Sequence, residues 1–152
     1  MLSKEEVKEL RIEFWDRLGK QMEKVRNPHG SKVNWMSYNT GVRHLYFRME
    51  ADEKGARLCI DLQFNDDGIR EIFYEQFQEF ENILNTTFKG LKWYANFDHW
   101  NGKKISRIAI EKEDCNYLNR NDWDKMHLFL KVNFKKLDEF WDEFGEVFKT
   151  LK

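Results

Sequence analysis

The sequence predicts one α+β domain over residues 1–152, with a predominantly antiparallel four-stranded sheet and three helices in the order αββαββα. Three observations lead to this class. Two segments that alternate between apolar and polar residues are followed by a long amphipathic segment, and this unit occurs twice. A further amphipathic segment precedes both units. Each alternating segment has one polar face, which is typical of an antiparallel sheet that carries its helices mainly on one face.

The first helix is predicted to begin at a capping box formed by Ser3 and Glu6, a spacing at which each side chain accepts a hydrogen bond from the other residue's backbone N–H. It is predicted to end before residues 27–30, because Pro28 disfavours helical geometry at the preceding residue and Gly30 tolerates any backbone angle. Its apolar stripe consists of Val7, Leu10, Phe14, Leu18, Met22 and Val25.

The first strand pair is predicted from strict alternation over residues 42–50 and 57–64. Residues 52–55 form a short turn that contains Gly55, which indicates an antiparallel hairpin. The side chains predicted to point into the core are Leu45, Phe47, Met49, Leu58, Ile60, Leu62 and Phe64.

The second unit begins with residues 65–67, which supply N-cap side chains for a helix that we expect to end near Gly90. A second hairpin is expected over residues 92–100 and 105–111, joined across Asn101 and Gly102, a dipeptide that favours tight hairpin turns. The apolar stripe of this helix consists of Ile69, Phe73, Phe77, Phe80 and Leu84.

The last helix is predicted to start at a cap formed by Asn121 or Asp122. Residues 57–61 and 107–111 are alike in pattern, which either an ancient duplication or chance would explain. The apolar stripe of the last helix consists of Trp123, Met126, Leu130, Phe134, Leu137, Trp141, Phe144 and Leu151.

Composition limits the classes of partner. The chain has 13 Phe, 6 Trp and 5 Tyr, enough ring surface for a packed core. Lys plus Arg (26) and Asp plus Glu (27) nearly cancel, so a nucleic-acid role would need a local basic patch. Cys59 and Cys115 lie far apart, which favours a reducing, cytoplasmic compartment. No window approaches the roughly 18 apolar residues that cross a bilayer, so no membrane partner is expected.

No arrangement of residues in the sequence points to a reaction. The four histidines are widely separated, and neither cysteine forms a close pair with another metal ligand. Neither a G-x-S-x-G elbow nor a Cys in a recognisable catalytic context is present, and the glycines form no phosphate-binding loop. We therefore expect no cofactor and no metal, assign no catalytic residue, and favour a protein that is not an enzyme.

A candidate binding surface is the polar face of the predicted sheet. Aromatic and arginine side chains are enriched in recognition surfaces, because they combine a large contact area with directional polar groups. Two other interpretations stay open: these residues only keep an exposed face soluble, or a helix covers them. The candidate residues are Tyr46, Arg48, Arg57, Asp61, Gln63, Tyr94, Asn96, Arg107 and Glu111.

An alternative is a metal-dependent nuclease. Asp61 and Gln63 lie on one predicted strand and Glu50 on its hairpin partner, so these side chains could hold Mg²⁺ for phosphodiester hydrolysis. The strand lacks the D/E-x-K triplet of such sites, and alternating charges on a solvated sheet face explain the same residues.

Most of the tryptophans fit core or helix-edge positions. Trp93 is expected to share a strand face with Ala95 and Phe97. Only Trp100, which lies beside the second hairpin turn, is expected to be free to contact a partner.

The order of the motifs resembles a known family. These motifs are the strand at residues 58–63, the helix end and strand start at 88–93, the strand at 107–110 and the Trp-containing last helix. From about Trp35 to the end, the chain is similar to the domain of unknown function 4268 family. That family often stands at the C-terminus of bacterial proteins with a nuclease-like region. The resemblance therefore implies a bacterial accessory role near nucleic-acid metabolism, and it supplies no catalytic residues.

The sequence thus favours a non-catalytic binding or accessory module that contacts a protein or a nucleic acid through the polar face of its sheet. The nuclease is the alternative, and a homo-oligomeric structural protein is a third class.

Overall fold

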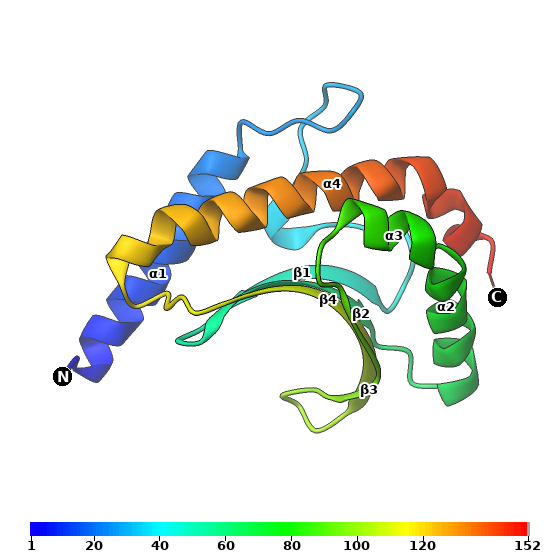
Figure 1. Ribbon diagram of the computed structural model, residues 1–152, viewed down its shortest axis with the longest axis horizontal. Helices are drawn as coiled ribbons and strands as arrows, with labels where there is room; N and C mark the ends of the chain where they lie inside the picture. Colours follow the sequence, from blue (N-terminus) through cyan, green and yellow to red (C-terminus); the bar gives the residue numbers. More distant parts are fainter. Residues whose placement is uncertain (152) are drawn as a thin grey trace.

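The computed structural model describes residues 1–151. Its centre is one antiparallel sheet with the strand order β1-β2-β4-β3, formed by β1 (Leu45–Ala51), β2 (Gly55–Leu62), β3 (Lys92–Asp98) and β4 (Lys104–Glu113). The sheet is strongly curved, and α2, α3 and α4 lie along its convex side while its concave side is open (Figure 1). The predicted α+β class, with helices mainly on one face, is confirmed.

Within residues 1–151, four α-helices are present where the sequence predicts three. They are α1 (Lys4–Met22), α2 (Asp67–Glu79), α3 (Glu81–Thr87) and α4 (Trp123–Lys149), with short 3-10 helices η1 (Trp35–Ser37) and η2 (Arg120–Asp122). The second predicted helix is broken at Phe80, whose φ of −95° and ψ of 13° depart from helical values. The break lets the Phe80 ring pack on Phe140 and Phe144 of α4, at centroid distances of 5.5 and 4.9 Å. Ile69, which was placed on the apolar stripe, is 38% exposed.

The predicted start of α1 is confirmed. The Ser3 hydroxyl accepts a hydrogen bond from the Glu6 N–H, and the Glu6 carboxylate accepts one from the Ser3 N–H, both at 3.1 Å. The helix buries Phe14 and Leu18 completely and crosses α4 at the end of the sheet where α4 begins (Figure 1). It ends at Met22, so Val25 of the predicted stripe lies beyond it.

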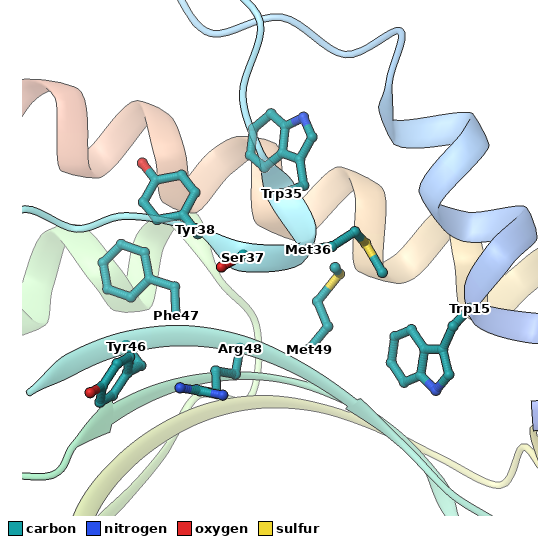
Figure 2. Close-up of a pocket in the computed structure, with 9 residues that line it drawn as sticks. All are labelled: Trp15, Trp35, Met36, Ser37, Tyr38, Tyr46, Phe47, Arg48 and Met49. Atoms are coloured by element: carbon teal, nitrogen blue, oxygen red, sulfur yellow. The ribbon is translucent and has the colours of Figure 1, made fainter. Parts of the chain in front are cut away.

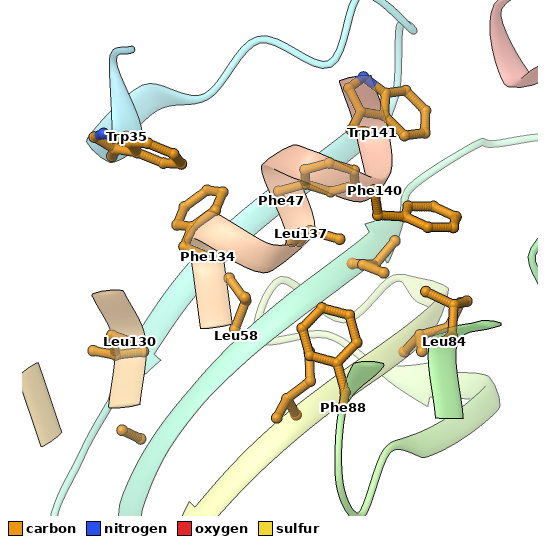
Figure 3. Packing of buried hydrophobic residues seen from close by; sticks show 14 of the residues in the cluster. Trp35, Phe47, Leu58, Leu84, Phe88, Leu130, Phe134, Leu137, Phe140 and Trp141 are labelled. Atoms are coloured by element: carbon orange, nitrogen blue, oxygen red, sulfur yellow. The ribbon is translucent and has the colours of Figure 1, made fainter. Parts of the chain in front are cut away.

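The hydrophobic core lies between α4 and the convex side of the sheet. Along its 27 residues α4 directs an apolar stripe at β1 and β2, and Leu84 of α3 and Phe88, directly after α3, close the layer (Figure 3). Phe134 and Leu137 of α4, and Leu58 opposite them, have no exposed surface. Because the apolar stripe spans the whole helix, α4 covers the sheet from one end to the other.

Strand β3 departs from the predicted alternation. Between Tyr94 and Phe97 a β-bulge adds one residue, which reverses the faces of the residues that follow. Trp93 therefore faces α2, where its ring lies 5.9 Å from that of Tyr74, whereas Phe97 lies on the opposite face. Asn96, which was expected on the polar face, instead lines a pocket beside α2.

Candidate functional site

The concave face of the sheet gathers most of the predicted binding residues. Cross-strand pairing aligns Tyr46, Asp61, Arg107 and Tyr94 in one row across the four strands. A second row contains Arg48 of β1, and a third row contains Glu50, Arg57 and Glu111. Seven of the nine candidate binding residues thus lie together, because an antiparallel ladder keeps alternate residues on one side. The concave-face residues are Tyr46, Arg48, Glu50, Arg57, Cys59, Asp61, Lys92, Tyr94, Phe97, Ile105, Arg107, Ala109 and Glu111.

Gln63 lies just beyond the end of β2, outside these rows but beside Tyr46 of the first row. Its backbone N–H donates to the His44 carbonyl at 2.8 Å. Its side chain lines a pocket of about 410 Å³ together with Tyr46, Lys103 and Lys104.

Arg107 forms the centre of the concave face. Its Nε donates to Asp61 Oδ1 at 2.7 Å and its Nη2 to Asp61 Oδ2 at 2.9 Å. The same guanidinium donates to both oxygens of Glu50, at 3.1 and 3.0 Å. Asp61 is fully buried and Arg107 is 3% exposed, so both support the face from beneath its surface. Two bidentate pairs on one guanidinium hold β1, β2 and β4 in a fixed relation.

Burial and charge act against each other in this cluster. Burial alone would lower the pKa of Arg107, but its hydrogen bonds and the charges of Asp61 and Glu50 raise that pKa above its usual value. Burial would likewise raise the pKa of Glu50, yet the charges and hydrogen bonds of Arg107 and Arg57 hold it below its usual range. Burial raises the pKa of Asp61, and the hydrogen bonds from Arg107 counter that effect only in part.

The remaining carboxylates of the concave face are also paired. Arg57 donates to Glu50 at 3.2 Å and to Asp52 at 2.9 Å. Glu111 accepts from the Tyr94 hydroxyl at 3.0 Å and lies 2.9 Å from the Lys92 ammonium. Each of these carboxylates therefore has a cationic partner within the protein.

The carboxylates that the nuclease alternative would use to hold Mg²⁺ are hydrogen-bonded to arginines. Both oxygens of Asp61 accept hydrogen bonds from Arg107, and both oxygens of Glu50 do the same. Over residues 1–151, no group of three or more His, Cys, Asp or Glu side chains is arranged to hold a metal ion. Cys59 lies on this face without exposed surface, and burial raises its pKa well above its usual value, so the thiol stays neutral. The carboxylates of Asp61 and Glu50 therefore act as hydrogen-bond acceptors for Arg107.

The accessible part of the concave face is aromatic and cationic. The Arg48 guanidinium is exposed and lies 4.4 Å from the centroid of the half-buried Tyr46 ring. Phe97 covers the Arg107 guanidinium at 4.3 Å. Trp100 is 87% exposed in the β3–β4 turn, which curls back below the concave face (Figure 1). Sequence reasoning missed Phe97 because a one-residue bulge carries no signal in the alternation.

These observations define an α+β domain in which one long helix covers the convex side of a curved antiparallel sheet and leaves the concave side open. Within the described residues, no helix has the length and apolar character needed to cross a membrane. Residues 10–145 match the family described as a domain of unknown function (DUF4268), and the chain belongs to that family. No curated protein and no solved structure matches the chain.

Proposed function

We propose that this protein is a non-catalytic binding module that contacts a partner protein through the concave face of its sheet. The observation that carries the proposal is the Arg107 cluster. It fixes three strands with buried ion pairs and leaves Tyr46, Arg48 and Phe97 at the accessible layer. A rigid base under aromatic and arginine groups lowers the entropy lost on binding, which is how recognition surfaces gain affinity.

Charge favours a protein over a nucleic acid as the partner. Binding of a polyphosphate chain requires unpaired cations along a groove. On the concave face Arg107, Arg57 and Lys92 are each held by carboxylates, which leaves Arg48 as the exposed arginine without an ion pair among the described residues. A partner with apolar and hydrogen-bonding side chains suits this surface better than a phosphate backbone.

We propose a bacterial, cytoplasmic setting for this interaction. The free thiols Cys59 and Cys115 support a reducing compartment, and the bacterial source is what the family resemblance of the sequence implies.

The test is a comparison of two variants of the whole chain as immobilised baits in a lysate of the source cells. Tyr46→Ser combined with Trp100→Ser removes accessible rings from the concave face and the turn below it. Leu128→Ser is the matched control, because Leu128 is 58% exposed on α4, which lies on the other side of the sheet. Partners identified by quantitative mass spectrometry should fall about tenfold with the double variant and stay constant with the control.

Equal capture by the double variant and the wild type would reject the concave face as the binding surface. Fluorescence anisotropy with labelled single-stranded DNA and RNA separates the classes of partner. Saturable binding of either oligonucleotide that the double variant abolishes would assign the face to nucleic acid instead.

A further inference from the structure

The two edges of the sheet differ in a way that points to a second interface. At one edge, β3 is interrupted by the bulge between Tyr94 and Phe97, and such irregularities protect an edge strand from pairing with another chain. At the other edge, β1 pairs with β2 in one unbroken register from Leu45 to Ala51. Its sequence, LYFRMEA, contains neither proline nor lysine, the residues that usually block an edge.

The ladder determines which backbone groups of β1 point away from the sheet. His44 accepts from the Gln63 N–H and Asp52 donates to the Gly55 carbonyl, so the even-numbered residues between them bond to β2. The odd-numbered residues face outward. At Leu45 these groups are occupied, because its N–H donates to Val42 and its carbonyl accepts from Thr40 Oγ1.

The outward groups of the next three odd positions are open in the sense that no hydrogen bond among the described residues engages them, but Phe47 is only 3% exposed, so a strand that pairs there must displace part of what covers this residue. Within residues 1–151, no hydrogen bond engages the outward N–H or C=O of Phe47, Met49 or Ala51. Beside this edge lies a pocket of about 330 Å³, with η1 over β1 and Trp15 of α1 at its end (Figure 2). Met36, which lines the pocket, is 48% exposed. An unpaired backbone edge next to an apolar pocket is the arrangement that accepts an added strand.

We propose that β1 pairs with β1 of a second copy of this chain, antiparallel about a two-fold axis at Met49. This register bonds Phe47 to Ala51 of the other copy and Met49 to Met49, so it uses all three open residues. It also places Arg48 of each copy opposite Glu50 of the other copy, which gives two such pairs. Shifting the axis to residue 48 or 50 would instead oppose two arginines or two glutamates.

Charge and burial both favour the second copy as the occupant. Arg48 is exposed and has no ion pair within residues 1–151, while Glu50 Oε2 accepts a single hydrogen bond, from Arg107, and the Glu50 side chain is 33% exposed. The side chains of odd-numbered residues point to the convex side, so Met49 of the second copy would enter the pocket beside Met36 and Trp15. The two sheets would then form one continuous sheet with a single extended concave face. This pairing stands independently of any partner of that face.

The first test is sedimentation of the whole chain from about 1 to about 300 µM. The wild type should shift from 18.6 kDa to twice that mass. Met49→Pro removes an outward N–H without breaking a β1–β2 hydrogen bond, so it should stay monomeric with an unchanged circular dichroism spectrum. Arg48→Glu should raise the dimer dissociation constant about tenfold or more, because each cross-strand pair becomes two carboxylates. Arg43→Glu makes the same charge change at an exposed residue outside β1 and should have no effect.

The second test is amide hydrogen exchange at both ends of this concentration range. In the dimer the amides of Phe47, Met49 and Ala51 should be protected, and dilution should make them exchange. The amides of the even-numbered residues of β1 should be protected throughout, because they bond to β2.

Each contrary result overturns the proposal. A chain that stays monomeric at the highest concentration excludes a second copy as the occupant of the β1 edge. If the odd-numbered amides of such a monomer become protected only when another protein is added, the occupant is that protein. A dimer in which these three amides still exchange rapidly uses a different face. A dimer that Met49→Pro and Arg48→Glu leave intact does not use β1.

Discussion

Removal of the Arg107 guanidinium should destabilise the fold more than any other single change on the concave face. Arg107→Met deletes four hydrogen bonds of 2.7 to 3.1 Å and leaves the fully buried Asp61 carboxylate without a counterion. The loss of one partner from a buried ion pair costs about 3–5 kcal/mol, because the other charge stays desolvated. For a chain of this length such a loss lowers the Tm by roughly 10 °C.

The assay is urea unfolding followed by circular dichroism, with two comparison variants. Arg57→Met is the matched control, because Arg57 also binds Glu50 but its side chain is 22% exposed, and we expect a loss of about 1 kcal/mol or less. Asp61→Leu combined with Arg107→Met removes both charges, while Glu50 keeps Arg57 as a partner. The double variant should therefore be less destabilised than the sum of its two single variants.

A cost of less than about 1 kcal/mol for Arg107→Met would refute a buried ion pair between Arg107 and Asp61, since Asp61 would then be solvated or protonated without penalty. Strict additivity of the two substitutions in the double variant would also refute this pair, because two groups that compensate each other cannot act independently.

Three further predictions concern stability and reactivity. Burial lowers the pKa of His127 below its usual value of about 6.5, so the unfolded chain takes up a proton first as the pH falls. Its contribution to stability is complete above pH 6.5 and declines below it, and His127→Gln should flatten the loss of unfolding free energy between about pH 7 and pH 5. A Cβ at residue 55 would lie 2.1 Å from a backbone oxygen of β4, so Gly55→Ala should cost about 1–3 kcal/mol in thermal unfolding; Gly19→Ala, within α1 and with its nearest contact at 4.0 Å, should instead stabilise the protein by about 0.5–1 kcal/mol. Cys59 should resist iodoacetamide in the native protein and react in urea, as mass spectrometry would show, because burial keeps its thiol neutral and inaccessible; labelling of Cys59 at the same rate in both conditions would contradict its placement.

Local pattern predicted the order of elements well, because each strand and helix segregates its apolar residues with a period that belongs to one kind of structure. Two departures were invisible to that reasoning. The break at Phe80 depends on where the α4 rings lie, and the bulge in β3 depends on how the sheet curves. Both are single-residue shifts imposed by packing partners that are distant in the chain.

The sequence by itself determined which side of the sheet the residues of β1, β2 and β4 occupy. Alternation alone placed Tyr46, Arg48, Asp61 and Arg107 together on the polar face, since side chains of a strand point to opposite faces in turn. Only the tertiary structure decided how deeply each of these side chains is buried. Because β2 and β4 are the central strands of a curved sheet, Asp61 and Arg107 are enclosed by their neighbours and become a buried ion pair, while Arg48 on the edge strand β1 remains in solvent. Depth depends on strand order and curvature, which are non-local properties that the period of a segment does not encode.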